Sequence, residues 1–574
     1  MATATVEIGG GDGEHGHLGL YPRCGICADT VFRHERVIAL FGNCDSTSYR
    51  GHTRPFVFPQ RGYPITRVDG YLLCRFPGCR KCAASPEFAP IHFDCFNIFS
   101  RRCLDSASDA LNRLWIFAAW KNPWRGAQPV RFSAGMLLEM IQQYSRHSLL
   151  WRSIPAVQFA EYVLATKPEP LLTVPLRELL LWERGGKFER VIGSPSPLPT
   201  LKITVDSVGI SKVERLPGPP GYGGECTNRF AFIVQDEASI SEVMAQFKDG
   251  QLRLDLPVRL RALPIIWNTP APPSLSLCKA YPTDLDSCQI INAVEMDEIE
   301  GITFFFSFGQ LFGIHIHRSE ESCAKDTFAR TFSPRHERTV VWIYLPIARH
   351  ARILVLSTRK ALDSRDVNVL VRTELIGDVI IGEQTTMMGE QSMIGDDRDH
   401  CSAASPPLTM IYGEPREGSP VRFLGAHCGQ PLDHALPKPF QLEEPGLSPI
   451  RNDAYFSWAP LCDVSSTLVF YDQYTGFCRG IVFRYQNGGS RAVGQCRLQV
   501  DPAETVVGPV RLCFRASLYS LGWGREKYTV RVKFKQDARA NCTEEDIEGW
   551  ESRLMKGLVK FWFTPVSSFL VVEN

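Results

Sequence analysis

The sequence predicts an α+β multidomain protein with a small Cys/His zinc-type module, a short helical region and two predominantly antiparallel β domains. Three observations predict this class. Eight of the 19 cysteines fall between Cys24 and Cys103, apolar residues recur at helical spacing after residue 105, and period-two alternation dominates beyond residue 200. The 574 residues are 44% hydrophobic, which excludes a disordered or collagen-like protein.

Changes in composition along the chain predict the domain boundaries. We expect a disordered tail at 1–20, a Cys/His-rich module at 21–104, a helical region at 105–192, a β-rich domain at 200–383, a long loop or linker at 384–450 and a β-rich C-terminal domain at 451–574. The linker is predicted because 384–450 is rich in Gly, Pro, Ser and Asp.

The helices are predicted from apolar spacing and capping residues. Leu111 begins an i, i+3, i+4, i+7 stripe, Ser133 can cap a second helix, and Pro175 can open the last one. The four expected helices span about 105–120, 133–144, 156–165 and 175–184.

The strands are predicted from alternation, which is clear in the run that begins at Leu201. The Asn487-Gly488 pair predicts a two-residue hairpin turn. The expected strand regions are 201–205, 229–234, 251–265, 302–318, 340–356 and 368–381, followed by a β-rich block at 455–534, an acidic helix near 544–558 and a strand at 559–563.

The cysteine-rich segment holds pairs of ligand-type residues separated by two residues. Such pairs let one tight turn present both side chains to a tetrahedral metal ion. The candidate metal ligands are Cys24, Cys27, Cys74, Cys79, Cys82, His92 and Cys95. We expect Cys24, Cys27, His92 and Cys95 to close one structural zinc site and the other three cysteines to support a second. Incidental buried cysteines and disulfides are the alternatives.

The same segment is basic, with a net charge of +7 between Arg23 and Arg125. Arginine and aromatic residues interleave around Arg50 to Arg67, a pattern that could bind nucleic acid. A solvated face is the simpler interpretation because no reading helix or binding motif accompanies the charge, so nucleic acid is not an expected partner.

The N-terminal region lacks the basic start and apolar core of a secretory signal, and no stretch approaches the ~18 apolar residues of a membrane span. We therefore expect an intracellular protein, cytoplasmic or nuclear, with no membrane contact. Thiolate–zinc ligation suits cysteines in such a reducing compartment.

Several motifs resemble uncharacterised proteins of filamentous fungi. The motifs are the Cys24–Cys27 pair, the Ile91–Phe96 run, Arg113–Trp120, Pro123–Arg125, Leu149–Arg152, Leu201–Leu216 and Phe470–Arg497. The resemblance implies an N-terminal Cys/His segment, an F-box-like helical region and β-rich domains, with no catalytic residues. The stretch from Phe132 that matches the F-box-like helix lacks its Leu-Pro start.

No phosphate loop, nucleophile elbow or zincin helix occurs, so no catalytic residue and no cofactor-binding residue is assigned. His315, His317 and Glu321 match half of a cupin metal motif, and the strands after Val341 have the rhythm of jacalin-type lectins. We expect a non-enzymatic, zinc-stabilised interaction or scaffold protein with protein partners. The alternatives are an F-box/RING-like substrate adaptor in ubiquitin ligation, or a lectin-like or cupin-like β domain that binds a small ligand.

Overall fold

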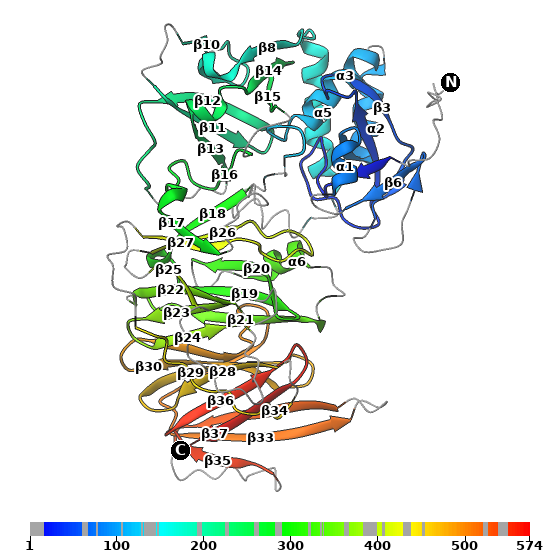
Figure 1. Ribbon diagram of the computed structural model, residues 1–574. Coiled ribbons are helices and arrows are strands. Elements are labelled where there is room, and N and C mark those ends of the chain that lie inside the picture. The colour runs from blue at the N-terminus through cyan, green and yellow to red at the C-terminus, as the bar shows by residue number, and fades with distance from the viewer. Residues whose placement is uncertain are drawn as a thin grey trace. The chain divides into compact units, whose positions relative to one another are not determined.

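In the computed structural model the chain forms two compact units. Unit 1 comprises Met1–Pro272 with Gln289–Ile291, and unit 2 comprises Pro273–Cys288 with Asn292–Asn574 (Figure 1). The structure describes residues 16–59, 67–75, 79–104, 107–127, 130, 145, 148–191, 198–223, 229–257, 263–281, 290–318, 323–332, 336, 338–349, 351–360, 367–382, 399–403, 408–428, 438–450, 454–520, 526–537 and 549–573. Among these residues, no helix has both the length and the apolar character needed to cross a membrane.

Unit 1 begins with a small module of short strands and helices. Its elements are β1 (His17–Gly19), β2 (Arg36–Gly42), β3 (Tyr49–His52), β4 (Phe56–Val57), β5 (Arg67–Val68), β6 (Tyr71–Cys74), α1 (Arg80–Ala84), β7 (Phe88–His92), α2 (Phe93–Arg102), α3 (Ala107–Ala119) and α5 (Leu150–Ala165). The apolar β2 pairs antiparallel with β3 and β4 and also with β7. This sheet therefore forms the buried centre of the module.

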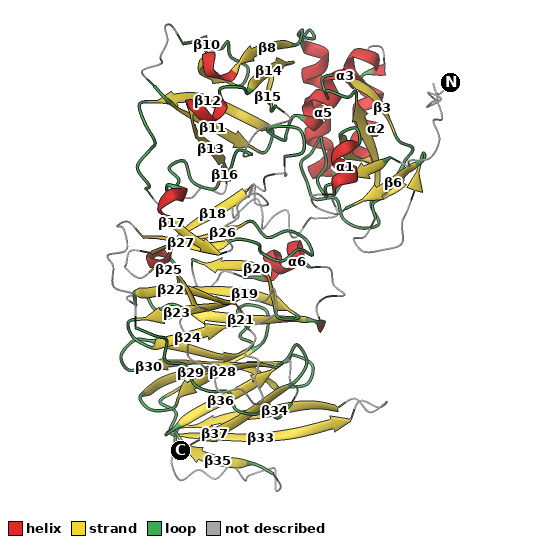
Figure 2. Ribbon diagram, viewed as in Figure 1, coloured by secondary structure: helices red, strands yellow, loops and turns green. Residues whose placement is uncertain are grey.

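The helices of this module pack on the sheet and on each other (Figure 2). Phe159 of α5 stacks on Phe117 of α3, with ring centroids 4.1 Å apart. The indole nitrogens of Trp115 and Trp120 both donate to the carbonyl of Ser46, at 3.0 and 3.2 Å. Two large buried rings thus hold α3 against the loop that follows β2.

The rest of unit 1 is mainly antiparallel sheet. Its elements are β8 (Leu172–Pro175), β9 (Leu179–Glu183), β10 (Glu189–Arg190), β11 (Thr200–Asp206), β12 (Gly209–Leu216), β13 (Ala231–Asp236), β14 (Met244–Lys248), β15 (Gln251–Asp255) and β16 (Ile266–Trp267), with short 3-10 turns at Leu176–Glu178 and Glu237–Ile240. The strand order is β10-β9-β12-β11-β13-β16, and a separate sheet runs β15-β14-β8. β16 pairs parallel with Ile290 and Ile291, the start of β18 (Ile290–Glu295).

Five predictions for unit 1 need comment. The helix expected from Pro175 is wrong, because Leu179–Glu183 forms strand β9 and pairs with β12, which buries Leu179 and Trp182. The tail predicted at 1–20 is also wrong at its end, where His17–Gly19 forms β1. The helices at 105–120 and 156–165 are present as α3 and α5, whereas the one at 133–144 lies outside the described residues.

In the part of unit 2 that the structure describes, the regular elements are almost all strands. They are β17 (Cys278–Tyr281), the end of β18, β19 (Gly301–Ser307), β20 (Gln310–His317), β21 (Val340–Pro346), β22 (Ile353–Lys360), β23 (Val367–Thr373), β24 (Gly377–Ile381), β25 (Asp399–Ala403), β26 (Leu408–Gly413), β27 (Leu424–Cys428), β28 (Tyr455–Pro460), β29 (Val464–Tyr471), β30 (Cys478–Tyr485), β31 (Ser490–Gly494), β32 (Ala503–Val507), β33 (Arg511–Ser520), β34 (Glu526–Lys535), β35 (Glu551–Leu554), β36 (Leu558–Phe563) and β37 (Ser568–Glu573). Among the described residues they are accompanied by a short helix, α6 (Lys325–Thr331), and by 3-10 turns at Leu275–Leu277 and Met296–Glu298.

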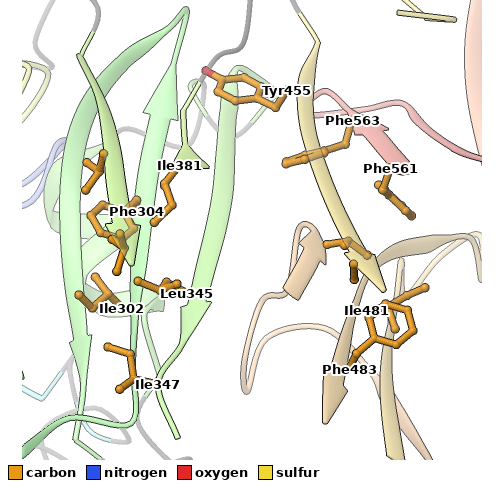
Figure 3. Close-up of a cluster of buried hydrophobic side chains, with 14 of the residues drawn as sticks. Ile302, Phe304, Leu345, Ile347, Ile381, Tyr455, Ile481, Phe483, Phe561 and Phe563 are labelled. Carbon is orange, nitrogen blue, oxygen red and sulfur yellow. The ribbon is translucent and has the colours of Figure 1, made fainter. Parts of the chain in front are cut away.

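These strands form small sheets that share one large core, and smaller buried clusters lie beside it. The sheets run β20-β19-β21, β24-β23-β22-β25, β28-β36-β37, β31-β30-β29-β32 and β34-β33-β35, and β27 lies between β26 and β17. Figure 3 shows part of this core, with Ile302 and Phe304 of β19 on one side and Ile481 and Phe483 of β30 on the other. The core takes buried residues from Val294 to Leu570.

The fold is therefore β-rich with several antiparallel sheets and few helices, and the α+β class is only roughly met. The interval 384–450 was expected to be a loop or linker, but it contains β25, β26 and β27. All six residues of β26 (Leu408–Gly413) are buried. The prediction failed here because this short, mostly apolar strand lies within a long polar stretch of sequence. The helix expected near 544–558 is also wrong where it is described, since Glu551–Leu554 forms β35.

Candidate metal centres

Two groups of four ligand-type side chains converge in the N-terminal module. Cluster A consists of Cys24, Cys27, His92 and Cys95, and cluster B consists of His17, Cys74, Cys79 and Cys82. Within each cluster the four ligand atoms all lie within 4.8 Å of one another, so each group could hold a metal ion.

Cluster A is assembled from a turn and a strand–helix junction. The turn from Cys24 to Ala28 closes through a hydrogen bond from the Ala28 backbone N–H to the Cys24 carbonyl, with Ala28 at a φ of 61°. β7 ends at His92, and Cys95 follows in the first turn of α2. The partial positive charge at the start of a helix favours a thiolate there.

A glycine lets the turn of cluster A fit closely against α3. A Cβ atom added at Gly25 would lie 2.5 Å from the Cβ of Ala118, a separation that real side chains do not show. The Gly25 backbone N–H also donates to the Pro90 carbonyl at 2.8 Å, which ties the turn to β7. The two halves of cluster A are thus joined by backbone contacts as well as by their ligands.

The separations inside cluster A suit a small tetrahedral ion. His92 Nδ1 lies 3.4 Å from Cys27 Sγ and 3.9 Å from Cys95 Sγ. Tetrahedral zinc, with Zn–S of about 2.3 Å and Zn–N of about 2.0–2.1 Å, sets nitrogen and sulfur about 3.6 Å apart. Cys24, His92 and Cys95 are almost completely buried, and Cys27 is partly buried.

A carboxylate orients the histidine of cluster A from outside. Glu35 Oε2 lies 3.2 Å from His92 Nε2 and accepts the backbone N–H of Phe32 at 2.7 Å. The other oxygen of Glu35 accepts a hydrogen bond from the Arg152 guanidinium. Metal-binding histidines commonly have such a carboxylate partner, which fixes the ring and raises its basicity.

The pKa values in the metal-free chain reflect the crowding of cluster A. Burial raises the pKa of Cys24, but hydrogen bonds with Cys27, Cys95 and His92 outweigh it and hold that pKa well below its ordinary value. Hydrogen bonding to Cys24 raises the pKa of Cys27 and of Cys95.

The histidine and its carboxylate partner carry opposite shifts. Burial lowers the pKa of His92, but hydrogen bonds to Cys24, Cys27 and Glu35 raise it to about 12. Burial raises the pKa of Glu35, but hydrogen bonds with His92, Arg152 and Phe32 lower it to about 2. These shifts favour charge on Cys24, His92 and Glu35 in the metal-free chain, and a bound cation would compete with protons for the ligand atoms.

Cluster B is assembled from a pair of strands and the start of α1. β1 pairs parallel with β6, which places Gly19 opposite Cys74 and brings His17 to the same end of the module. His17 Nδ1 lies 3.7 Å from Cys79 Sγ and 3.8 Å from Cys82 Sγ. The four residues of cluster B are only partly buried, so this cluster is nearer to solvent than cluster A.

Burial also shapes the thiol pKa values in cluster B. It raises the pKa of Cys82, and the neighbouring Cys74 adds to this. Burial raises the pKa of Cys79, but hydrogen bonds from the Cys82 backbone and thiol lower it by more, so this pKa lies below its ordinary value. The first cysteine of each pair, Cys24 and Cys79, is therefore the more acidic partner in the metal-free chain.

The structure brings together all seven side chains that the sequence singled out. Cys24, Cys27, His92 and Cys95 meet in the predicted grouping, and Cys74, Cys79 and Cys82 meet in the other cluster. The residue missed was His17, which lies in the segment expected to be a disordered tail. The incomplete set of three cysteines, together with the Leu18 and Leu20 alternation that follows His17, could have indicated it.

The two histidines that match half of a cupin motif, His315 and His317, each lie within hydrogen-bond distance of a threonine hydroxyl. His315 Nδ1 lies 2.9 Å from Thr327 Oγ1, and His317 Nε2 lies 2.8 Å from Thr303 Oγ1. His317 is fully buried. Glu321 lies outside the described residues, and within the described part of unit 2 no group of three ligand-type side chains forms.

Three protein cysteines and one histidine in each cluster supply a complete tetrahedral donor set. Such a set leaves no coordination position for water or substrate, which distinguishes a structural metal centre from a catalytic one. In comparisons with known proteins, no protein-family model matches this chain and no curated protein matches it.

Proposed function

We propose that clusters A and B each hold one structural zinc ion, and that the chain acts as a non-enzymatic interaction or scaffold protein whose N-terminal module is stabilised by these ions. The observation that carries the proposal is the convergence of two Cys3His donor sets, each within 4.8 Å. Zinc is favoured because thiolate and imidazole ligands in tetrahedral geometry select it over harder cations.

The position of the clusters explains what zinc would do. Cluster A links the turn after residue 23 to the junction of β7 and α2, and cluster B links β1 to β6 and α1. These elements are short: β4 and β5 have two residues each, and α1 has five. Elements of this length need cross-links, since a small core alone stabilises them poorly.

Metal analysis of the full-length chain, purified without chelators, tests the zinc assignment. We expect two zinc ions per chain, and about one in either Cys24→Ser/Cys95→Ser or Cys74→Ser/Cys82→Ser. Cys44 and Cys462 are exposed and lie in neither cluster, so Cys44→Ser/Cys462→Ser is the matched control and should keep two. Less than about half a zinc per chain would contradict the proposal.

A second candidate function is an F-box/RING-like substrate adaptor in ubiquitin ligation. The order of the ligands along the chain favours it: His17 of cluster B precedes Cys24 and Cys27 of cluster A, the three cysteines of cluster B follow, and His92 and Cys95 of cluster A come last. Interleaved ligands of this kind are a property of cross-braced zinc modules. Recovery of cullin-complex subunits with the full chain from cell extract would favour the adaptor, and their absence would favour the scaffold.

A further inference from the structure

Clusters A and B differ in how far their sulfur ligands are shielded from solvent. In cluster A, Cys24 and Cys95 are fully buried and Cys27 is partly buried. In cluster B, Cys79 and Cys82 are both partly exposed. Oxidation of cysteine follows the thiolate character and the exposure of each sulfur. With thiolates bound to zinc in both clusters, exposure therefore sets the order in which a dissolved oxidant reaches them.

The turn of cluster A is covered by helical residues of the module. Lys121, which follows α3, donates from its ammonium to the Ile26 carbonyl at 3.0 Å, and this ammonium also lies over the Phe117 ring at 4.6 Å. From α5, the carbonyl oxygen of Arg152 lies 3.6 Å from Cys95 Sγ. An oxidant must therefore displace packed side chains or backbone to approach most of the sulfur atoms of cluster A.

Cluster B has much less cover. Cys79 directly precedes α1 and Cys82 lies within it, and this helix has only five residues. Gly19 of β1 lies beside Cys82, where an added Cβ atom would be 3.5 Å from the Cys82 sulfur. Because glycine has no side chain, the Cys82 sulfur stays uncovered from that direction.

The two partly exposed sulfurs of cluster B are also placed to bond with each other. Cys79 and Cys82 are separated by two residues, and their Sγ atoms lie within 4.8 Å of each other. A disulfide needs a separation of about 2.0 Å, which a change in one turn and its side-chain torsions can provide. The sheet made by β1, β6 and β5 does not have to move for this bond to form.

Backbone contacts and buried side chains hold the rest of cluster B in place without a metal ion. Leu18 and Leu20 are buried in the core of the module. The Leu20 N–H donates to the Cys74 carbonyl at 2.8 Å, and the His17 N–H donates to Ser85 Oγ at 3.0 Å. The ligands His17 and Cys74 therefore stay near their positions when the ion leaves, so the site can form again on reduction.

We propose that cluster B is an oxidant-sensitive zinc site, at which a peroxide converts Cys79 and Cys82 into a disulfide and releases the zinc ion while cluster A keeps its own. This inference rests on the two zinc sites proposed above. It makes zinc occupancy of the module depend on the redox state of one cysteine pair.

The chemistry of this step balances with hydrogen peroxide as the oxidant. One of the two thiolates attacks a peroxide oxygen, the O–O bond breaks, and the sulfur becomes a sulfenic acid. The second thiolate attacks that sulfur and expels hydroxide, which forms the S–S bond. The two sulfurs lose two electrons, and the peroxide takes both electrons and two protons from water to leave as two water molecules. Zinc then keeps only His17 and Cys74 of its four ligands and dissociates.

Zinc release from the full-length, zinc-loaded protein tests the proposal, with hydrogen peroxide as oxidant and a chromophoric chelator as detector. We expect about one zinc per chain in a fast phase and the second at least about tenfold more slowly. Cys24→Ser/Cys95→Ser, which keeps cluster B, should show the fast phase alone. Cys74→Ser/Cys82→Ser, which keeps cluster A, should show the slow phase alone. Equal rates for the two ions, or faster release from cluster A, would overturn the proposal.

Mass spectrometry of the unmodified protein, stopped after the fast phase, identifies the bond. Trypsin cleaves after Arg75, Arg80, Lys81 and Arg101, so Cys79 lies on peptide 76–80 and Cys82 on peptide 82–101. We expect these two peptides to be joined, with fragmentation placing the bond at Cys82. A fast-phase disulfide within peptide 24–33, which carries both cysteines of the cluster A turn, would contradict the proposal. So would fast release of zinc without any disulfide.

Two controls separate this step from general damage. Cys44→Ser/Cys462→Ser removes exposed cysteines outside both clusters and should keep both release phases. After the fast phase the circular dichroism spectrum should be unchanged, and dithiothreitol with added zinc should restore two ions per chain; loss of the fold in this phase would refute the local step. A protein that holds no zinc from the start would refute the zinc sites themselves, whereas two ions that leave together would refute this inference alone.

Discussion

Glu35 gives the sharpest test of how cluster A is organised, because it touches the ligand His92 without belonging to the cluster. Its carboxylate lies 3.2 Å from His92 Nε2, also binds Arg152, and is only 22% exposed. Glu35→Gln keeps the size of the side chain and removes the charge. The zinc-bound imidazole then loses its anionic acceptor, and a neutral amide oxygen in the same place raises the basicity of the ring less.

Loss of such an outer partner typically weakens metal binding about 10- to 100-fold, or about 1.4–2.7 kcal/mol. One effect acts in the opposite direction. Glu35 also raises the pKa of His92 in the metal-free chain, where it is about 12. Without the Glu35 charge, His92 holds its proton less tightly, so the proton competes less strongly with zinc. We therefore expect the lower end of the range near neutral pH, about tenfold.

Competition against a chromophoric chelator measures this affinity, and Cys82→Ser identifies which of the two steps belongs to cluster B. Glu87→Gln is the matched control, because Glu87 binds Arg253 at 2.7 and 2.8 Å and contacts neither cluster. The control should leave both steps unchanged. A cluster A step that stays within about twofold in Glu35→Gln would refute the role given to this carboxylate.

Three further predictions concern packing, a buried ion pair and pH. Gly25→Ala forces a contact with Ala118 and should lower the free energy of unfolding of the zinc-loaded chain by about 1–3 kcal/mol in chemical denaturation; an unchanged value would contradict the close fit. Arg113, 3% exposed, lies 3.7 Å from Asp249 and donates to the Val163 and Thr166 carbonyls, so Arg113→Met should cost about 3–5 kcal/mol. The exposed Arg102→Ala should cost about 0–1 kcal/mol by the same measurement, and similar losses in both variants would count against the buried pair. Burial, with His317 and Arg330 nearby, lowers the pKa of His315 from 6.5 to about 3, so the unfolded chain takes up a proton there first and stability falls as pH drops below 6.5, by at most about 1.4 kcal/mol per pH unit. Unfolding of His315→Gln at several pH values should show a shallower decline over that range, and an identical slope would remove His315 as the cause.

The parts of this structure that could be read from the sequence are those set by local spacing. The cysteine pairs separated by two residues predicted the metal-binding clusters, and the apolar stripe that begins at Leu111 predicted helix α3. The Asn487-Gly488 turn is also present, but as a three-residue loop: the Tyr485 N–H donates to the Gly489 carbonyl, and Gly488 alone has positive φ.

The parts that could not be read depend on contacts between distant residues. Leu179–Glu183 has the composition of a helix, and only its pairing with β12 makes it a strand. His17 stands 57 positions before Cys74, and the parallel pairing of β1 with β6 brings the two together. In the same way Met410, in the expected linker, belongs to the core of unit 2 because β26 pairs with β27.

X-ray absorption at the zinc edge of the full-length protein tests the central claim most directly, because it counts the atoms bound to the metal. Two ions in clusters A and B should give an average shell of three sulfurs at about 2.3 Å and one nitrogen at about 2.0–2.1 Å per zinc. A shell dominated by oxygen or nitrogen would contradict the account of both clusters, as would a protein that binds no zinc at all.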